Sequence, residues 1–388
     1  MACEKEFLMP EYYSDFKCKM GECRASCCEG WMVTFSLEDY FKLSGEECSK
    51  ELRDKIDRGV KVSLHPTPDE YAQIQHDYTG NCPMRLADGR CAIHAEMGAN
   101  ALGEVCKLYP RGLRKEPDFE CSCANSCEST LETMFEKDEP IKFVKKSIVL
   151  DSQIKLSRSV KFDTKGREQD IRLWLIKIVQ QRDYSLPIRL MNLGLALRDM
   201  KCALDDKNEA TISKLISKTY NMKNVEFEVD DNQLQFGITT AEKLLKLIGE
   251  KSNSVRVFGE QALEFFGDEN AAFEKYKSAK KQFESKVPKW EIWFEHMLVN
   301  HMFFEQFPFQ DRPEEPWEEF VAICAVYALL RFLGIGWMAT KGNTSDFVDM
   351  SAAVFRLVDH TSFDRYAAHL LQRLGCDTPQ KVFDLVML

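Results

Sequence analysis

The sequence predicts a mainly α-helical protein in two parts, an irregular, cysteine-rich N-terminal part and an all-helical part that follows it. All but three of the 15 cysteines lie between Cys3 and Cys127. This stretch also holds many turn-forming glycines and prolines, whereas apolar residues later in the chain recur at helical spacing. We therefore expect a cysteine-rich, metal- or cluster-binding domain over residues 1–140 and a helical domain over residues 141–388.

Length and composition indicate a soluble globular protein. The 388 residues are 44% hydrophobic and 29% charged, enough to bury a full core without disulfide crosslinks. The N-terminal stretch MACEKEFLMPEYY lacks the basic and apolar regions of a secretory signal. This predicts a cytoplasmic location, where thiols stay reduced. The net charge of -10 argues against a nucleic-acid partner.

Short helices and one hairpin are expected in the first part. Asp88-Gly89 is a turn-forming dipeptide, and the segments 81–84 and 90–94 on either side of it suit the two strands of a hairpin.

Two amphipathic helices are expected in the second part. One has an apolar stripe made of Leu190, Leu193, Leu197, Met200 and Leu204. Ser185 and Pro187 are suited to be its cap and its first turn. The other helix spans 289–307 and ends at the proline-rich stretch 306–319, which we expect to be a loop.

Residues 320–339, FVAICAVYALLRFLGIGWMA, have the length of a membrane span and a single charge, Arg331. We favour a central helix that is buried on all sides, with Arg331 paired to a carboxylate, because no other segment of the chain is of this kind. Gly334 and Gly336 suit close helix packing. Peripheral membrane association is the alternative interpretation.

The cysteines of the first part predict a metal centre. Thiolates are soft ligands that select iron–sulfur clusters, zinc or cuprous copper. Only Cys23 and Cys27 have the spacing of a zinc knuckle, and ferredoxin-type runs are absent. We therefore expect a metal or cluster assembled from separate loops, and spacing alone does not distinguish iron–sulfur from zinc. The remaining cysteines are expected to be small buried hydrophobes: Cys3, Cys48, Cys202, Cys324 and Cys376.

Few other residues suggest chemistry. Nucleotide-binding glycine loops and the common hydrolase and zinc-protease motifs are absent from the sequence. His296 and His301 are expected to be core or surface residues. His94 follows Cys91 by three positions and is more typical of a loop histidine than of a metal ligand.

Two further positions keep alternatives open. Arg356 and His360 share one helix face at a spacing of four, for which a surface pair is the default interpretation. Trp31 follows the first cysteine group, where simple packing is the default and covering a metal or stacking on a ligand are the alternatives.

Motifs along most of the chain resemble the bacterial flagellin lysine-N-methylases. YYSDFKCKMGECRASCCEGWMV resembles the family opening F-x-C-x-G-x-x-C-x-x-x-C-C-x-G-W-x-V, with Met20 where a glycine is common. NCPMRLADGRCAIHAEMGANALGEVCKLYPR resembles the segment that ends in Y-P-R, at Arg111. Cys127 resembles the cysteine of an S-C-P-E segment. Residues 171–197 are similar to a helix pair of the family, and residues 355–360, FRLVDH, resemble S-R-x-x-x-H.

The resemblance implies a protein-lysine N-methyltransferase that carries methyl groups from S-adenosylmethionine to flagellin and contains a 4Fe-4S cluster. By matching position, the implied metal ligands are Cys18, Cys23, Cys27, Cys28, Cys82, Cys91, Cys106 and Cys127. Trp31 and Arg111 are implied as cofactor-binding residues, and Arg356 and His360 are candidates for a catalytic patch. Eight cysteines exceed the four that one cubane takes, so some hold a second metal or serve the structure.

An alternative follows from a second resemblance. The first part is also similar to a broader family of cysteine-cluster zinc or iron chelators, which implies a metal-binding protein without methyl transfer. Polar and radical methyl transfer both stay open at this stage. Because a dinucleotide-type glycine loop is absent, S-adenosylmethionine is not expected to bind as it does in Rossmann methyltransferases.

Overall fold

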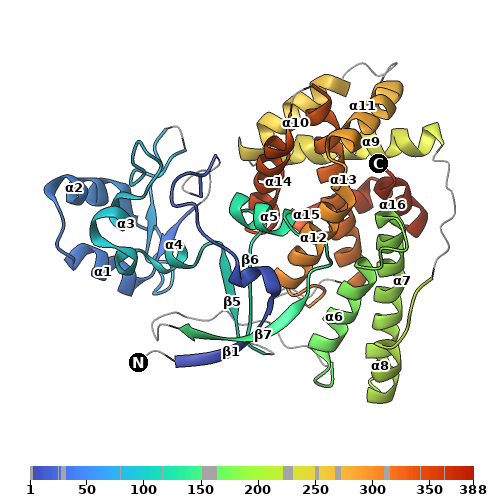
Figure 1. The fold of residues 1–388 in the computed structure, drawn as a ribbon, viewed down its shortest axis with the longest axis horizontal. Helices are drawn as coiled ribbons and strands as arrows, with labels where there is room; N and C mark the ends of the chain where they lie inside the picture. The colour runs from blue at the N-terminus through green and yellow to red at the C-terminus, as the bar shows by residue number, and fades with distance from the viewer. Residues whose placement is uncertain are drawn as a thin grey trace.

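The computed structural model describes most of the chain. The described residues are 3–24, 26–27, 32–78, 80–115, 118–150, 164–221, 230–249, 253–266, 272–309, 315–340, 342–361 and 363–388. They form a small N-terminal lobe, a four-stranded sheet and a larger helical body, with the sheet between the lobe and the body (Figure 1). The prediction of a mainly helical protein is confirmed for these residues.

Two sheets organise the N-terminal third of the chain. Their strands are β1 (Cys3–Pro10), β2 (Thr34–Phe35), β3 (Val60–Val62), β4 (Ala72–Ile74), β5 (Arg111–Arg114), β6 (Glu120–Cys123) and β7 (Phe143–Leu150). The larger sheet has the order β5-β6-β1-β7, in which β1 is parallel to β6 and antiparallel to β7. The smaller sheet, β2-β4-β3, is antiparallel and belongs to the lobe.

The lobe has its own hydrophobic core. Its helices are α1 (Leu37–Gly45), α2 (Lys50–Gly59), α3 (Ala92–Met97) and α4 (Glu104–Leu108), with a 3-10 turn at Ala99–Ala101. Ser36 and Ser49 cap α1 and α2 through their hydroxyls, as expected for serine at a helix start. Phe35, Leu43 and Ile56 pack between these helices and the small sheet.

Helices dominate the rest of the chain. After a 3-10 turn at Glu11–Ser14, they are α5 (Glu128–Phe135), α6 (Glu168–Val179), α7 (Leu186–Asp205), α8 (Glu209–Leu215), α9 (Asp231–Gly249), α10 (Asn253–Phe266), α11 (Ala272–Lys286), α12 (Trp290–Phe304), α13 (Pro316–Thr340), α14 (Thr344–Val358), α15 (Phe363–Arg373) and α16 (Pro379–Val386). One continuous core joins them and reaches the sheet at Leu8 and Cys123.

The part after residue 140 is not all-helical, in contrast to the prediction. β7 pairs with β1 along its whole length, from Cys3 opposite Leu150 to Pro10 opposite Phe143. Its sequence FVKKSIVL contains the β-branched residues Val144, Ile148 and Val149, which favour strands. The sheet therefore joins residues from both sides of the predicted domain boundary, which itself stays a prediction.

The two predicted helices are present as α7 and α12, but α12 is not amphipathic, because residues 294–303 are buried on all its faces. Ser185 is the residue before α7, but its side chain caps no backbone amide. The amide of Leu186 instead lies 3.4 Å from Glu291 Oε1, so a carboxylate of α12 takes the place of the expected cap. Part of the proline-rich stretch after α12 lies outside the described residues.

The apolar segment 320–339 lies within α13, at the centre of the body. By length and composition α13 would be able to cross a membrane, but 94% of its most apolar window is buried inside the protein. Arg331 pairs with Glu284 at 2.9 Å and lies over the ring of Trp290. A Cβ on Gly336 would lie 2.8 Å from Ala262, so glycine allows α10 to pack closely. These contacts confirm the buried-helix interpretation and leave little of α13 for membrane contact.

Candidate metal centre

Six of the predicted metal ligands line one cavity in the N-terminal lobe. The cavity has a volume of about 220 Å³, and its thiols are Cys18, Cys23, Cys27, Cys82, Cys91 and Cys106. They come from the loop after β1, from the turn before α3, and from α4. The other walls are mainly apolar, with Phe35, Met84 and Ile93 among them, and His94 also lines the cavity. Thiols that are far apart in the sequence therefore line the same cavity.

Cys127 lies beside this group. It is the residue before α5, where backbone amides of Ser129 and Thr130 favour its thiolate, although burial raises its pKa overall. Burial is also the main cause that raises the pKa of Cys23 to about 11, and the charges of Glu128 and Cys127 add to it. Such thiols are protonated at neutral pH, so a bound metal has to displace their protons.

Two glycines bring the cysteine-bearing loops into contact. The turn at Asp88-Gly89 forms, with Leu86 N donating to Arg90 O at 2.8 Å, but the predicted hairpin strands do not. Arg85 and Cys91 form one isolated bridge, and residues 92–94 belong to α3. Gly89 has a φ of +84°, and a Cβ there would lie 2.3 Å from the carbonyl oxygen of Gly21. The loop of Cys18 and Cys23 thus rests directly on the turn between Cys82 and Cys91.

The backbone conformation at Met20 explains why the family motif commonly has glycine at this position. Its φ of +56° is in the left-handed region, which glycine adopts without steric cost. This turn aims the Met20 amide at Cys18 Sγ, 3.4 Å away.

The thiols surround the cavity without converging on one point. Within the described ranges, no three Cys, His, Asp or Glu side chains are close enough to hold a single metal ion. Two of the predicted site residues, Cys28 and Trp31, lie outside the described residues.

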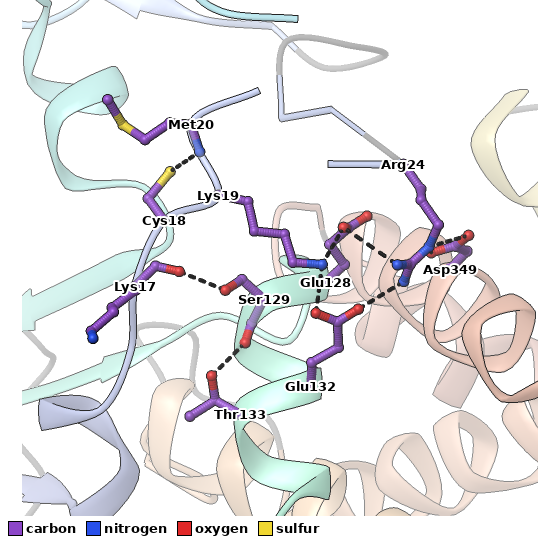
Figure 2. A network of polar contacts seen from close by, with 10 residues as sticks. All are labelled: Lys17, Cys18, Lys19, Met20, Arg24, Glu128, Ser129, Glu132, Thr133 and Asp349. Carbon is purple, nitrogen blue, oxygen red and sulfur yellow. Dashed lines mark hydrogen bonds and ion pairs between the residues drawn. The ribbon is translucent and has the colours of Figure 1, made fainter. Parts of the chain in front are cut away.

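A set of ion pairs connects the first cysteine loop to α5 and α14 (Figure 2). We call it the charge clasp and define it as Lys19, Arg24, Glu128, Glu132 and Asp349. Lys19 Nζ lies 2.8 Å from Glu128 Oε1 and 2.5 Å from Glu132 Oε2. Arg24 binds Glu132 at 2.9 Å and both oxygens of Asp349 at 2.9 and 3.0 Å.

The side chains of Arg356 and His360 lie next to the cavity wall. Ser126 Oγ lies 2.8 Å from His360 Nε2 and accepts a hydrogen bond from Tyr109 OH at 3.1 Å. Tyr109 in turn lines the cavity. Burial lowers the pKa of His360, the Asp359 charge opposes this shift, and the Arg356 charge adds to it. The two residues do not share one helix face as expected, because α14 ends at Val358 and His360 follows it. Arg356 is half-buried and His360 is exposed.

The remaining candidates lie elsewhere. Arg111 is on β5, where its guanidinium lies 4.9 Å from the ring centroid of Phe16, and it is not among the described residues that line the cavity. His296 is buried and contacts the carbonyl oxygens of Met134 and Glu139. His301 is buried and contacts Asp359. Both histidines are core residues, as expected.

Sequence reasoning missed Tyr109, Ser126 and Glu128. Tyr109 is in the Y-P-R motif, while Ser126 and Glu128 flank Cys127 directly. Adjacency to a predicted ligand was therefore the available signal for two of them. For the contact between Ser126 and His360, which lies 234 residues further along the chain, the sequence gave no signal.

The fold and the cavity define a mainly helical protein whose N-terminal lobe carries a thiol-lined site. Residues 172–385 match the family model of the FliB lysine N-methylase C-terminal domain, which is more than half of the chain. The chain therefore belongs to this lysine N-methylase family, and the family resemblance seen in the sequence is confirmed.

Curated relatives agree over a shorter stretch. They include proteins named lysine-N-methylase from Salmonella choleraesuis (strain SC-B67) and Salmonella typhimurium (strain LT2), each 26% identical over 106 residues. Flagellar biosynthetic protein FliU from Salmonella muenchen is also 26% identical over 106 residues. Each alignment covers 26% of this chain, and it spans 25% of the two methylases and 60% of FliU. No solved structure matches the chain.

Proposed function

We propose that the protein is a cytoplasmic lysine N-methyltransferase that transfers the methyl group of S-adenosylmethionine to lysine side chains of flagellin, with a 4Fe-4S cluster held by the cavity thiols. Family membership supports the reaction class, and the printed name of the FliU relative supports a flagellar substrate. The single observation that carries the cluster is the gathering of six thiols from separate segments around one cavity.

The donor set fits an iron–sulfur cluster better than a single zinc ion. Four thiolates on one zinc ion converge at about 2.3 Å from the metal, whereas the four cysteines of a cubane each bind a different iron and stand further apart. Thiols that surround a cavity without converging match the second case. When bound, a cluster with one iron left open by cysteine would supply a site for the amino and carboxylate groups of S-adenosylmethionine.

The chain also offers a route for the proton that the reaction releases. A lysine ammonium must lose a proton before its nitrogen can attack. As the new N–C bond forms, the sulfonium C–S bond breaks and its electron pair returns to sulfur. Tyr109 OH, Ser126 Oγ and His360 Nε2 form a hydrogen-bonded line from the cavity wall to an exposed imidazole. The lowered pKa keeps His360 neutral at pH 7, so it is able to accept the proton and pass it to water.

Anaerobic purification tests the cluster. We expect brown protein with iron and acid-labile sulfide in equal amounts, and an added mass of one or more methyl groups on lysine when flagellin of the same organism and S-adenosylmethionine are supplied. Cys91→Ser should lose the iron, because oxygen is a poorer ligand for the cluster than sulfur. Cys202→Ser, which alters a thiol on α7 away from the cavity, should retain it. Colourless protein that holds only zinc and leaves flagellin unmodified would favour the metal-binding alternative.

Replacing His360 tests the proton route. His360→Ala should lower turnover at pH 7 on the order of tenfold or more without loss of iron, because the proton then has no base to accept it. The deficit should shrink as the pH rises, because hydroxide removes the proton directly. Arg356→Gln leaves the base in place and should cost less. A deficit that does not change with pH would contradict the role of His360 in proton transfer.

A further inference from the structure

The first cysteine loop has a regular relation between thiols and cations. Lys19 directly follows Cys18, and Arg24 directly follows Cys23. Both thiols line the cavity, whereas both cations take part in the charge clasp on the opposite side. Figure 2 shows the sulfur of Cys18 directed away from the Lys19 ammonium, which points to α5.

The charge clasp differs from ordinary surface ion pairs in burial and connectivity. The Glu128 side chain is only 1% exposed, although it contacts Lys19 and lies 3.9 Å from Arg24. Glu132 binds both cations, and Arg24 reaches a second helix at Asp349 with two contacts. Isolated exposed pairs contribute little, but a network with one buried member and an arginine that bridges two helices has a defined geometry.

A hydrogen bond from a side chain of α5 to the backbone also holds this loop. Ser129 Oγ donates to the carbonyl oxygen of Lys17 at 2.6 Å, so the residue before Cys18 is tied to the first turn of α5. That turn begins right after Cys127, which lies near Cys18 and Cys23. The charge clasp and Cys127 are thus both located at the start of α5.

We propose that Lys19 and Arg24 are positioning residues, which hold the loop so that Cys18 and Cys23 face the cavity in the orientation that binds the metal. This inference rests on the proposed function only in that the cavity thiols bind a metal. Through Asp349 the clasp also ties the metal site to α14, the helix that precedes His360.

Retention of the cluster by the anaerobically purified full-length protein tests the inference. Excess iron chelator is added, and the loss of the visible absorbance of the cluster is followed with time. Arg24→Gln should lose the cluster on the order of tenfold faster than the wild type. Arg24→Lys, which keeps the charge but has a single nitrogen to reach both Glu132 and Asp349, should fall between them. Glu51→Gln, which removes an exposed i,i+4 pair with Lys55 from the same lobe, should match the wild type.

Salt separates positioning from a general loss of stability. Higher ionic strength weakens the partly exposed clasp and should speed cluster loss from the wild type, but should have a smaller effect on Arg24→Gln, which keeps only the ion pairs of Lys19. Equal rates and equal salt dependence in the wild type and Arg24→Gln would overturn the positioning role while leaving the proposed function intact. A wild-type protein that binds no iron would overturn the proposed function and the positioning role with it.

Discussion

Glu168, the first residue of α6, is a buried carboxyl group whose charge is poorly compensated. Its side chain is almost fully buried, at 4% exposure, and burial raises its pKa to about 7. Arg172 opposes this shift only in part, because its guanidinium is already bound to both oxygens of Glu120 at 2.8 and 2.7 Å. The folded protein therefore binds a proton at Glu168 more tightly than the unfolded chain does.

Replacing this group should change how stability depends on pH. Because the folded pKa is above the ordinary value of 4.5, the stability linked to Glu168 is fully present below that pH and is lost as the pH rises through about 7. Glu168→Gln removes the titration, so its stability relative to the wild type should rise between pH 5 and pH 8, on the order of 2 kcal/mol. Urea unfolding at several pH values measures this. A constant difference between the two proteins would contradict the assignment.

Single residues were the scale at which the sequence was most informative about the site. Thiol chemistry led to the prediction of a metal site, which stays a prediction, and six of the eight named cysteines line the cavity. Arg111 illustrates the limit. Arg111 ends the sequence motif that contains Cys106, but in the structure it begins β5 and its guanidinium lies over the ring of Phe16.

Among the elements, the contact between Gly21 and Gly89 has the clearest consequence. The two loops meet backbone to backbone, with no room for a side chain at Gly89. Gly80, in the same lobe, has a similar φ of +86° but open space around it. Comparing Gly89 with Gly80 therefore separates two contributions to the free energy of unfolding, that of a left-handed backbone and that of forcing the loops apart.

Gly89→Ala should therefore lower both stability and metal content, whereas Gly80→Ala should only lower stability by about 1 kcal/mol. The alanine at 89 displaces the loop of Cys18 and Cys23, so the thiols no longer meet around the cavity. Thermal unfolding and iron content after reconstitution measure the two effects. If both variants retain the same amount of iron, the glycine contact does not assemble the site.

Helices were predictable from the sequence and the large sheet was not. The apolar stripe of α7 and the continuous apolar run of α13 are local patterns, so they can be read within one window. Strand β1 pairs with β7, more than a hundred residues later in the chain. Residues 7–10 of β1 are buried on both of its faces, whereas residues 4–6 are charged and exposed. It therefore shows no alternation of polar and apolar residues that would reveal a strand.

At the scale of the molecule, the lobe and the body have separate hydrophobic cores of very different size. The lobe core comprises few buried residues, centred on Phe35, Leu43 and Ile56, and the cavity thiols lie at its edge. The body core extends through all of the long helices. A small core gives limited stability by itself, so a metal bound at the cavity would contribute more to the stability of the lobe than to that of the body.

Removing the metal should loosen the lobe and leave the body folded. Hydrogen exchange followed by mass spectrometry should show faster exchange over residues 32–106 in the metal-free protein, with α7, α12 and α13 unchanged. Uniformly faster exchange along the chain would show that the two parts unfold together. Unchanged exchange in the lobe would show that the cavity thiols do not hold a structural metal.

The joining of the lobe loop to α14 could not be predicted from the sequence. Arg24 and Asp349 are separated by 325 positions, and the sequence around either residue does not indicate that the other is its partner. Charge pairs of this kind depend on how the whole chain folds back, so only the structure reveals them.

The central place of β1 in the large sheet also affects how the protein is made. This strand is synthesised before its neighbours β6 and β7, which follow only after the entire lobe, at Glu120–Cys123 and Phe143–Leu150. At bacterial or eukaryotic elongation rates the ribosome needs roughly 7–30 s to produce the intervening chain. During that interval β1 exposes apolar side chains and unpaired backbone on both edges. A nascent chain in this state is a natural client for ribosome-associated chaperones, and their depletion should reduce the soluble yield of this protein more than that of a purely helical one.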